Sequence, residues 1–445
     1  MTIDEINIKA FELVSLVEIV SIEVSNQKSQ LVGSAKEKGF VDWSDKIIND
    51  GIEKTLNQAD ETTTIHIVKN QNRIGFNKEN YPSFLSLVTA IKNNDFFKAK
   101  SSLSFIEKET LYWLIEIIDT KIAGSNLIDY LKNEVEQKIG EHQFYFPVIN
   151  LNIENPFKIG NVEFCYFTKK YFDDYFTAKN NEKVTISKEE FETLFHNEYI
   201  GQVIVKIKVS AESEHAEEIA KNEAQNAVDV LKIYGITSTV PETKTMFDLN
   251  HRLNYQTKAN FLSQNLSKSD DLLISIKFNN PTYSINDAYL NNAKANGMET
   301  FSHFISLKND DDFYKLIIQS ISIFASSLSN FDLHNRAISL ITVLESLLLL
   351  DDEEHKMEKF VKARIEKLLS DIFPDKELLK AHITKIYKVR HKMVHKAIRL
   401  NIDTKELAFV QIVIINLLLM MMRYNVIEKH TSKVTIINFL NSSNK

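Results

Sequence analysis

The 445-residue chain has one cysteine, ten glycines and six prolines, and it lacks a long apolar run. A single cysteine excludes a disulfide framework and favours a reducing compartment, so we expect a cytoplasmic protein. With so few glycines, a glycine-rich phosphate-binding loop is hard to build, and no such motif occurs. The longest apolar run, within residues 409–422, has about 14 residues. A membrane span needs about 20, so we expect no membrane partner.

Charge is unevenly distributed along the chain. The whole chain has a net charge of −7, from 53 Lys and Arg against 60 Asp and Glu. Residues 355–400 hold 13 Lys and Arg against 5 Asp and Glu, an excess of +8 that leaves −15 for the rest. A basic segment on an acidic protein suits a local RNA-binding surface. The alternative is that these lysines only solvate exposed helix faces.

Length and pattern together predict a multidomain, predominantly α chain with three parts. Residues 1–140 form the first part, a mainly helical N-terminal region. Its helical stretches lie at 44–57, 82–93 and 100–138, and residues 62–70 alternate like a strand. No catalytic motif occurs in this region.

The second predicted part is an α+β domain at residues 141–308. Its segments FYFPVINLNIE (144–154) and GQVIVKIKVS (201–210) alternate apolar and polar residues as strands do, and a helix follows at 211–234. We interpret this domain as a regulator or sensor, because it too carries no catalytic motif.

The third predicted part, residues 309–445, is a helical bundle. Apolar residues recur at helical spacing in five segments. These segments are 310–330, 335–350, 356–369, one that begins at 375, and 404–427. The second segment is almost continuously apolar, and Glu345 is its one interior charge.

The fourth segment of the bundle carries the most informative motif, Arg390-His391-x-x-x-His395. Arginine keeps its charge and can hold a phosphate through two parallel hydrogen bonds. Histidine, as a residue type, can move protons to and from a ribose hydroxyl. This combination suits RNA chemistry.

Helical geometry places only part of the motif on one face. At about 100° per residue, His391 and His395 lie within about 40° of each other, with Tyr387 on the same stripe. Arg390 and His395 diverge by about 140°. Either the long arginine bends round, or the arginine of one chain meets the histidine of a second chain across a dimer.

At residues 310–430 the sequence resembles the HEPN superfamily, and within it the Apea-like branch. The resemblance rests on VLESLLLL (343–350), a basic amphipathic helix, IYKVRHKMVHKA (386–397) and a long apolar helix, in that order. The signature of this branch is Tyr, then Arg, a polar residue, three more residues and His. The family often has glycine directly after this histidine, whereas Lys396 stands here.

The resemblance implies a metal-independent endoribonuclease without cofactors that acts as a homodimer through the HEPN-type bundle. Arg390 would bind the scissile phosphate, and His395 would act as base on the 2′-hydroxyl or as acid on the leaving 5′-oxygen. His391 would fill the polar position that orients one of them. Tyr387 and Glu345 would support the site, with Glu345 either anchoring Arg390 or pairing with another base.

The resemblance also implies a biological setting. Host RNA, with tRNA as a candidate, would be cut in anti-phage defence or abortive infection. The upstream domains would restrain the nuclease until a phage-derived activator relieves them. In the basic segment, we expect Lys388, Lys392 and Lys396 to contact RNA.

Other functions remain open at this point. His391 and His395 have the spacing of two zinc ligands, but Lys392 stands where a zinc protease needs glutamate, and Cys165 lies far away in sequence. The domain could also be a non-catalytic HEPN module that binds RNA or a partner protein. A third alternative is a bundle that only dimerises.

Overall fold

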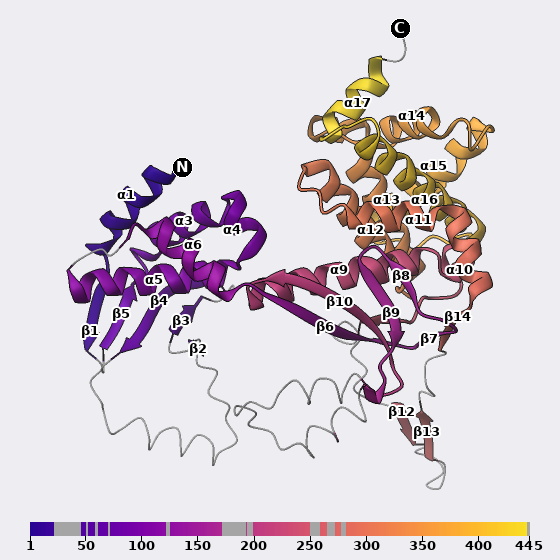
Figure 1. Ribbon diagram of the computed structural model, residues 1–445. Coiled ribbons are helices and arrows are strands. Elements are labelled where there is room, and N and C mark those ends of the chain that lie inside the picture. Colours follow the sequence, from indigo (N-terminus) through magenta and orange to yellow (C-terminus); the bar gives the residue numbers. More distant parts are fainter. Residues whose placement is uncertain are drawn as a thin grey trace. The chain divides into compact units, whose positions relative to one another are not determined.

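The computed structural model describes residues 1–21, 46–49, 52–57, 61–69, 72–121, 125–170, 193, 199–249, 259–264, 272–276 and 282–442. The chain packs into two compact units (Figure 1). The N-terminal unit comprises residues 1–142 with 208–219, and the C-terminal unit comprises residues 143–207 with 220–445. The structure thus differs from the three predicted domains, because residues of the second and third pack as one unit.

An antiparallel five-stranded sheet, which the sequence analysis did not predict, lies in the N-terminal unit. The strand order is β1-β5-β4-β3-β2. The strands are β1 (Glu18–Ser21), β2 (Lys46–Asn49), β3 (Ile52–Leu56), β4 (Thr62–Lys69) and β5 (Asn72–Phe76). Only β4 matches a predicted strand. The prediction of a mainly helical N-terminal region is therefore incomplete, and the predicted helix at 44–57 is wrong, since its described residues form β2 and β3.

Among the described residues of 1–142, five helices accompany the sheet, and Figure 1 shows them over one of its faces. They are α1 (Ile3–Val14), α3 (Tyr81–Lys92), α4 (Asp95–Lys100), α5 (Leu103–Thr120) and α6 (Leu127–Lys138). The predicted helix at 82–93 is confirmed as α3. The single helix predicted at 100–138 is two helices, because α5 ends where Lys121 takes a left-handed conformation (φ 58°).

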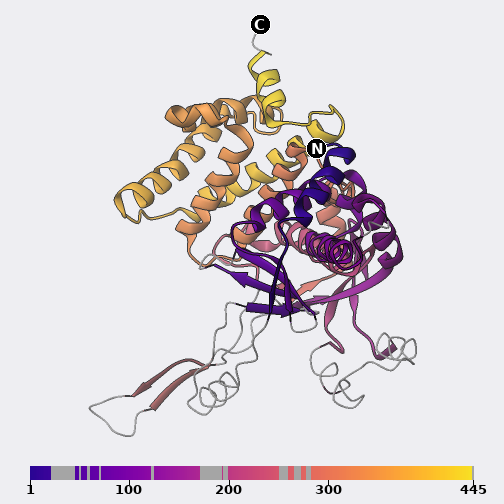
Figure 2. The same cartoon turned by 90° about the vertical axis from the view of Figure 1, so that its left-hand side faces the viewer.

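A second five-stranded sheet, of order β11-β6-β10-β9-β8, precedes the bundle in the chain. Its strands are β6 (Gly140–Ile149), β8 (Phe157–Ile159), β9 (Val162–Tyr166), β10 (Val203–Ala211) and β11 (Asp248–Leu249). Helix α9 (Ser213–Ile233) follows β10, which confirms the predicted strand and helix at 201–210 and 211–234. Two further strand pairs are the parallel β7 (Leu151–Ile153) with β14 (Tyr283–Ile285), and the antiparallel β12 (Ala259–Gln264) with β13 (Leu272–Ile276) (Figure 2).

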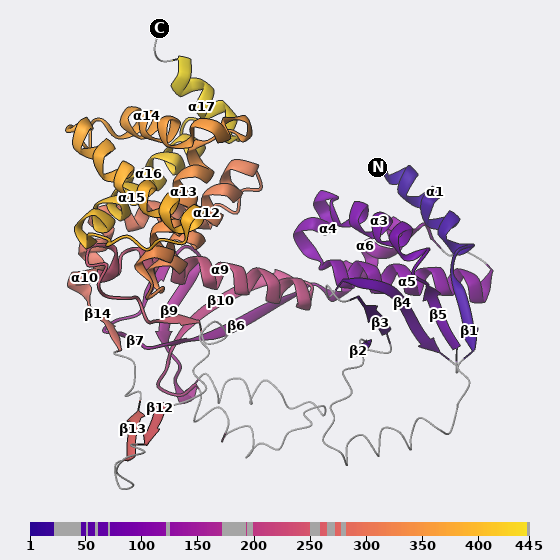
Figure 3. The same cartoon turned by 180° about the vertical axis from the view of Figure 1, so that it is seen from behind.

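Described residues 287–442 of the C-terminal unit form a helical bundle, and its five predicted helices are all confirmed. They are α12 (Asp312–Leu328), α13 (Leu333–Leu348), α14 (Met357–Leu369), α15 (Lys376–Lys396) and α16 (Thr404–Val426) (Figure 3). The sequence analysis did not predict α10 (Asp287–Ala293), α11 (Glu299–Ser306) or α17 (Lys433–Ser442). Helix α11 packs against α16, which joins the end of the predicted middle domain to the bundle.

Helix α16 occupies the centre of this bundle. It packs against α11, α12, α13, α14 and α15. Within the described residues it is the one helix long and apolar enough to cross a membrane, but half of that stretch is buried in the protein. Core helices of globular bundles have the same composition, so the helix is weak evidence for a membrane span. Helices dominate the described secondary structure, and the predominantly α, multidomain architecture is confirmed.

Candidate functional site

Helix α15 carries the Arg-His motif in its last turns. The helix begins after Asp375, whose side chain accepts a hydrogen bond from the Leu378 backbone N–H. Such a cap satisfies a donor that would otherwise have no partner in the helix. The helix ends at Ala397, which takes a left-handed conformation (φ 52°). Lys396 is therefore the last helical residue, and the left-handed position falls one residue later.

One face of α15 anchors the motif in the core. Leu379, Ile383, Ile386 and Val389 are buried there, next to α13, α14 and α16. Tyr387 is also buried, with 6% of its surface exposed. This packing fixes the rotation of the helix and hence the direction in which the motif residues point.

A cleft of about 730 Å³ lies along the second half of α15. Its other wall is the first turns of α14 together with the preceding 3-10 helix η4 (Asp351–Lys356). The cleft is lined by His355, Lys356, Met357, Glu358, Lys359, Lys362, Thr384, Tyr387, Lys388, Arg390, His391 and His395. We call it the basic cleft, because its side chains include four lysines and one arginine but one carboxylate, Glu358, which pairs with Lys362 at 2.8 Å.

The basic cleft brings together five of the predicted site residues: Tyr387, Lys388, Arg390, His391 and His395. The other three do not line it. Lys392 and Lys396 lie on α15 outside the lining, and Glu345 lies behind it on α13. His355, Lys356 and Lys359 line the cleft although no motif in the sequence pointed to them as site residues.

Glu345 forms an ion pair with Arg390, at 3.4 Å between its Oε2 and the guanidinium Nη2. The two side chains are 16% and 24% exposed, respectively. Burial raises the pKa of the Glu345 carboxyl, whereas the Arg390 charge and the Tyr387 hydroxyl lower it. Two roles were considered for Glu345, and the observed ion pair corresponds to the one in which Glu345 anchors Arg390.

The buried Tyr387 hydroxyl lies beside this ion pair. Burial and then the Glu345 charge raise the pKa of Tyr387 far above its usual value, so the hydroxyl keeps its proton at neutral pH. Within the described residues, neither this hydroxyl nor Oε1 of Glu345 makes a hydrogen bond of ordinary geometry. The hydroxyl oxygen is itself fully buried, and after burial the neighbouring Glu345 carboxylate has the largest influence on it.

His391 and His395 lie next to each other on the exposed side of α15. Their ring centroids are 4.9 Å apart and the ring planes are inclined by 45°. The expected shared stripe with Tyr387 is confirmed, since all three line one cleft. Arg390 and His395 of a single chain also line this cleft, despite their divergence around the helix.

In the part of the chain that the structure describes, no group of three or more His, Cys, Asp or Glu side chains is placed to hold a metal ion. His391 and His395 thus lack a third protein ligand among these residues. A zinc site, whether structural or catalytic, needs at least three protein ligands.

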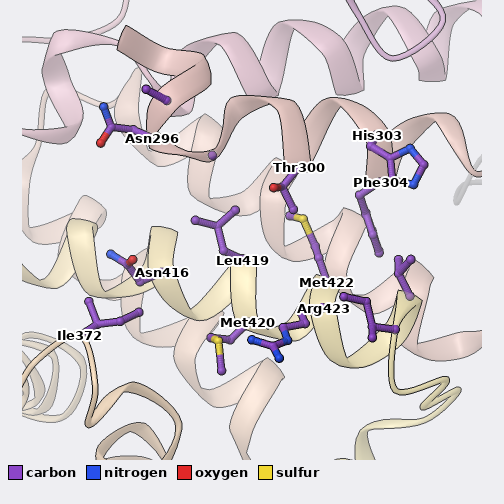
Figure 4. A pocket seen from close by; sticks show the side chains of 14 residues that line it. Asn296, Thr300, His303, Phe304, Ile372, Asn416, Leu419, Met420, Met422 and Arg423 are labelled. Atoms are coloured by element: carbon purple, nitrogen blue, oxygen red, sulfur yellow. The ribbon is translucent and has the colours of Figure 1, made fainter.

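A second cavity, of about 600 Å³, lies elsewhere in the same unit (Figure 4). We call it the apolar cavity, because side chains such as Phe304, Leu419, Met420 and Met422 dominate its lining. It lies between α16, α11 and the π-helical segment Lys294–Met298. Its ionisable residues are His303 on α11 and Arg423 on α16, both labelled in Figure 4.

Comparisons of the chain with protein-family models, with curated proteins and with solved structures found no match. The residues of the basic cleft are therefore the observations that bear on function.

Proposed function

We propose that this protein is a metal-independent endoribonuclease of the HEPN type, with the basic cleft as its active site. The observation that carries the proposal is that Arg390, His391 and His395 line one basic cleft on one chain. A cleft with an excess of cations attracts a polyanion. Histidines that are exposed to it can reach the ribose hydroxyl of a bound strand.

In the proposed reaction the substrate supplies the nucleophile. The 2′-oxygen of a ribose attacks the adjacent phosphorus, and the bond from phosphorus to the 5′-oxygen breaks. The products are a 2′,3′-cyclic phosphate and a 5′-hydroxyl, so no water and no metal ion enter the step. Arg390 stabilises the charge that develops on the phosphoryl oxygens. His395 accepts the 2′-proton or protonates the 5′-oxygen, which typically contributes about 10²–10⁴-fold to the rate.

The neighbouring residues support these roles. Glu345 on α13 holds the guanidinium of Arg390, which lines the cleft. The Tyr387 hydroxyl, buried and protonated beside Glu345, would help to hold that carboxylate in place. His391 orients His395 through the contact between their rings. Lys388 lines the cleft and would contact the RNA backbone, while Lys392 and Lys396 would extend that contact along α15.

The proposed setting is a cytoplasmic defence system. The protein would act as a homodimer through its bundle and would cut host RNA, with tRNA as a candidate, in response to phage infection. The upstream regions would hold the nuclease inactive until a phage-derived activator binds. A nuclease that cuts the RNA of its own cell needs such restraint, and residues 1–308 offer surface for it.

A second candidate function is a non-catalytic module that binds RNA or a partner protein. One observation favours it: Glu345 already neutralises part of the Arg390 charge that catalysis would use. In that case the cleft would bind phosphates without cutting.

The test is to map RNA ends in bacterial cells that overproduce the wild-type chain or its His395→Ala variant, with a method that captures 2′,3′-cyclic phosphates. We expect new cyclic-phosphate ends only with the wild-type chain, and their positions will identify the substrate. If neither protein produces new ends, the same mapping during phage infection tests for a latent enzyme. No cleavage in either condition contradicts the nuclease proposal and favours the binding module.

A further inference from the structure

His355 lies in the basic cleft, although it belongs to a different element from the motif. It precedes α14 by two residues, at the end of η4, and its side chain is exposed. His391 and His395 line the opposite wall, on α15. The cleft therefore presents histidines from two walls to the space between them.

The proposed cleavage needs two proton transfers on opposite sides of one phosphorus atom. The attacking 2′-oxygen loses a proton and the leaving 5′-oxygen gains one, and in phosphoryl transfer these two oxygens lie roughly in line through the phosphorus. Each proton-transfer group must come within about 3 Å of its own oxygen. The base and the acid are then separated by the phosphate and cannot be in contact with each other.

His391 and His395 do not meet this requirement as a pair. Their ring centroids are only 4.9 Å apart, on neighbouring turns of one helix, so both rings lie on the same side of a phosphate bound in the cleft. Histidine is the residue type whose side chain suits both proton transfers near neutral pH, so a histidine is sought for the second role. A group that complements His395 has to come from the wall formed by η4 and α14, whose acid–base side chains are His355 and Glu358. Glu358 is already paired with Lys362 at 2.8 Å, which leaves His355.

We infer that His355 and His395 are the general acid–base pair of the proposed ribonuclease, one on each wall of the cleft. This inference rests on the proposed function. One of the two histidines takes the 2′-proton as the 2′-oxygen bonds to phosphorus. The other, protonated beforehand, gives its proton to the 5′-oxygen as that bond breaks. After each turnover the first histidine releases its extra proton to solvent, and the second takes up a proton from solvent.

A change of leaving group tests this pair. The substrate is an oligoribonucleotide that contains a mapped cleavage site, prepared with either oxygen or sulfur at the 5′-bridging position. A thiolate leaves without protonation, so the sulfur substrate does not need the acid. The proteins are the full-length wild-type chain, His355→Ala and His395→Ala, with His303→Ala in the apolar cavity as the matched control.

On the oxygen substrate we expect both cleft variants to lose about 10²–10⁴-fold in rate, while His303→Ala cuts like the wild type. On the sulfur substrate we expect one and only one of the two cleft variants to return close to the wild-type rate. His355→Ala cutting the oxygen substrate at the wild-type rate would overturn the inference. An equal response of the two variants to sulfur would overturn it as well. Either result would leave the nuclease itself standing, whereas a wild-type chain that cuts neither substrate, even with infected-cell extract added, rejects the nuclease and the pair together.

Discussion

The basic cleft and the apolar cavity have similar volumes, about 730 and 600 Å³, yet their chemistry differs. Both contain arginine and histidine. In the basic cleft, Arg390 is held by a half-buried carboxylate and lies beside paired histidines among several lysines. In the apolar cavity, Arg423 and His303 are exposed residues on separate helices among methionines and other apolar side chains. The comparison teaches that two cavities of similar volume can differ in chemistry, and that the convergence of charged side chains makes the basic cleft the candidate phosphate site.

The largest expected difference between the two cavities is in RNA cleavage. Arg390→Ala and His395→Ala each remove a group that the proposed mechanism places on the phosphate or its oxygens, so we expect the cleavage rate to fall by about 10²–10⁴-fold. Arg423→Ala and His303→Ala make the same changes in the apolar cavity and should leave the rate unchanged. Initial rates on one RNA substrate compare all four variants. If the apolar-cavity variants lose as much cleavage rate as the basic-cleft variants, the two cavities do not differ in activity.

The next largest expected effect is on the free energy of unfolding. It distinguishes Arg336, a structural arginine of the bundle, from Arg390. Arg336 is 1% exposed and donates hydrogen bonds to the backbone carbonyls of Ser327, Pro241, Thr243 and Asn330. Burial lowers its pKa to about 10, so it remains charged at neutral pH. We expect Arg336→Leu to destabilise the protein by about 3–5 kcal/mol, because several buried carbonyls lose their donor.

Arg390→Leu is the matched control, measured by urea unfolding of the same chain. The Arg390 side chain is partly exposed and has one ion pair, at 3.4 Å, so we expect Arg390→Leu to lose less stability than Arg336→Leu. If Arg390→Leu costs as much as Arg336→Leu, Arg390 is a structural residue and the proposed site loses its phosphate-binding group.

A smaller effect on stability is expected at the apolar cavity. Gly297, in the π-helical segment, has φ 101°, and an added Cβ would lie 3.0 Å from the side chain of Leu419. Gly201 also has positive φ, at 81°, but a Cβ there meets no atom within 4 Å. We expect Gly297→Ala to cost about 1 kcal/mol more than Gly201→Ala in urea unfolding, because only the first adds a steric clash. RNA cleavage should not change in either variant, and a loss in Gly297→Ala alone would link the apolar cavity to activity.

The smallest expected effect is a pH dependence of stability. The pKa of Glu345 is raised from its ordinary 4.5, mainly by burial. Its contribution to stability is therefore fully present below 4.5 and is lost as pH rises through the folded-state pKa. Between pH 4 and 7, the unfolding free energy of the wild type relative to Glu345→Gln should fall with rising pH.

Glu353 offers a control of opposite sign. Its pKa is lowered, first by a hydrogen bond from Arg364, so its contribution is present above the ordinary value and is lost as pH falls. The wild type relative to Glu353→Gln should therefore gain stability with rising pH over the same range. If the two differences in unfolding free energy change with pH in the same direction, the raised pKa of Glu345 is contradicted.

The sequence predicted the bundle well because its helices have long, regular apolar patterns. The segments around Val343 and Leu417 can only be buried helices, and α15 follows from its apolar residues at helical spacing. The N-terminal sheet was missed because its strands are short. In residues 46–56, Ile47, Ile48 and Ile52 fit a helical spacing as well as a strand pair, although the Asp-Gly that follows Asn49 is a sequence that favours hairpins.

The candidate site was predictable only along one helix. The spacing of Arg390, His391 and His395 predicted how their side chains are arranged around the helix. Glu345 was a candidate partner because it is the one interior charge in an apolar helix. His355 lies 35 residues before Arg390 in a polar segment, DDEEHK, with no pattern that connects the two. Only the packing of α14 against α15 brings His355 to the cleft.

Cleavage of a defined RNA by the purified full-length chain, in the presence of EDTA, tests the central claim most directly. Product ends and rates would be compared between the wild type and His395→Ala, with unfolding curves to show that both are folded. We predict that the wild type produces 2′,3′-cyclic phosphate and 5′-hydroxyl ends at a rate that the chelator does not change, and that His395→Ala produces none. Loss of cleavage on chelation, or equal cleavage by His395→Ala, would contradict the proposal that the basic cleft is a metal-independent ribonuclease site.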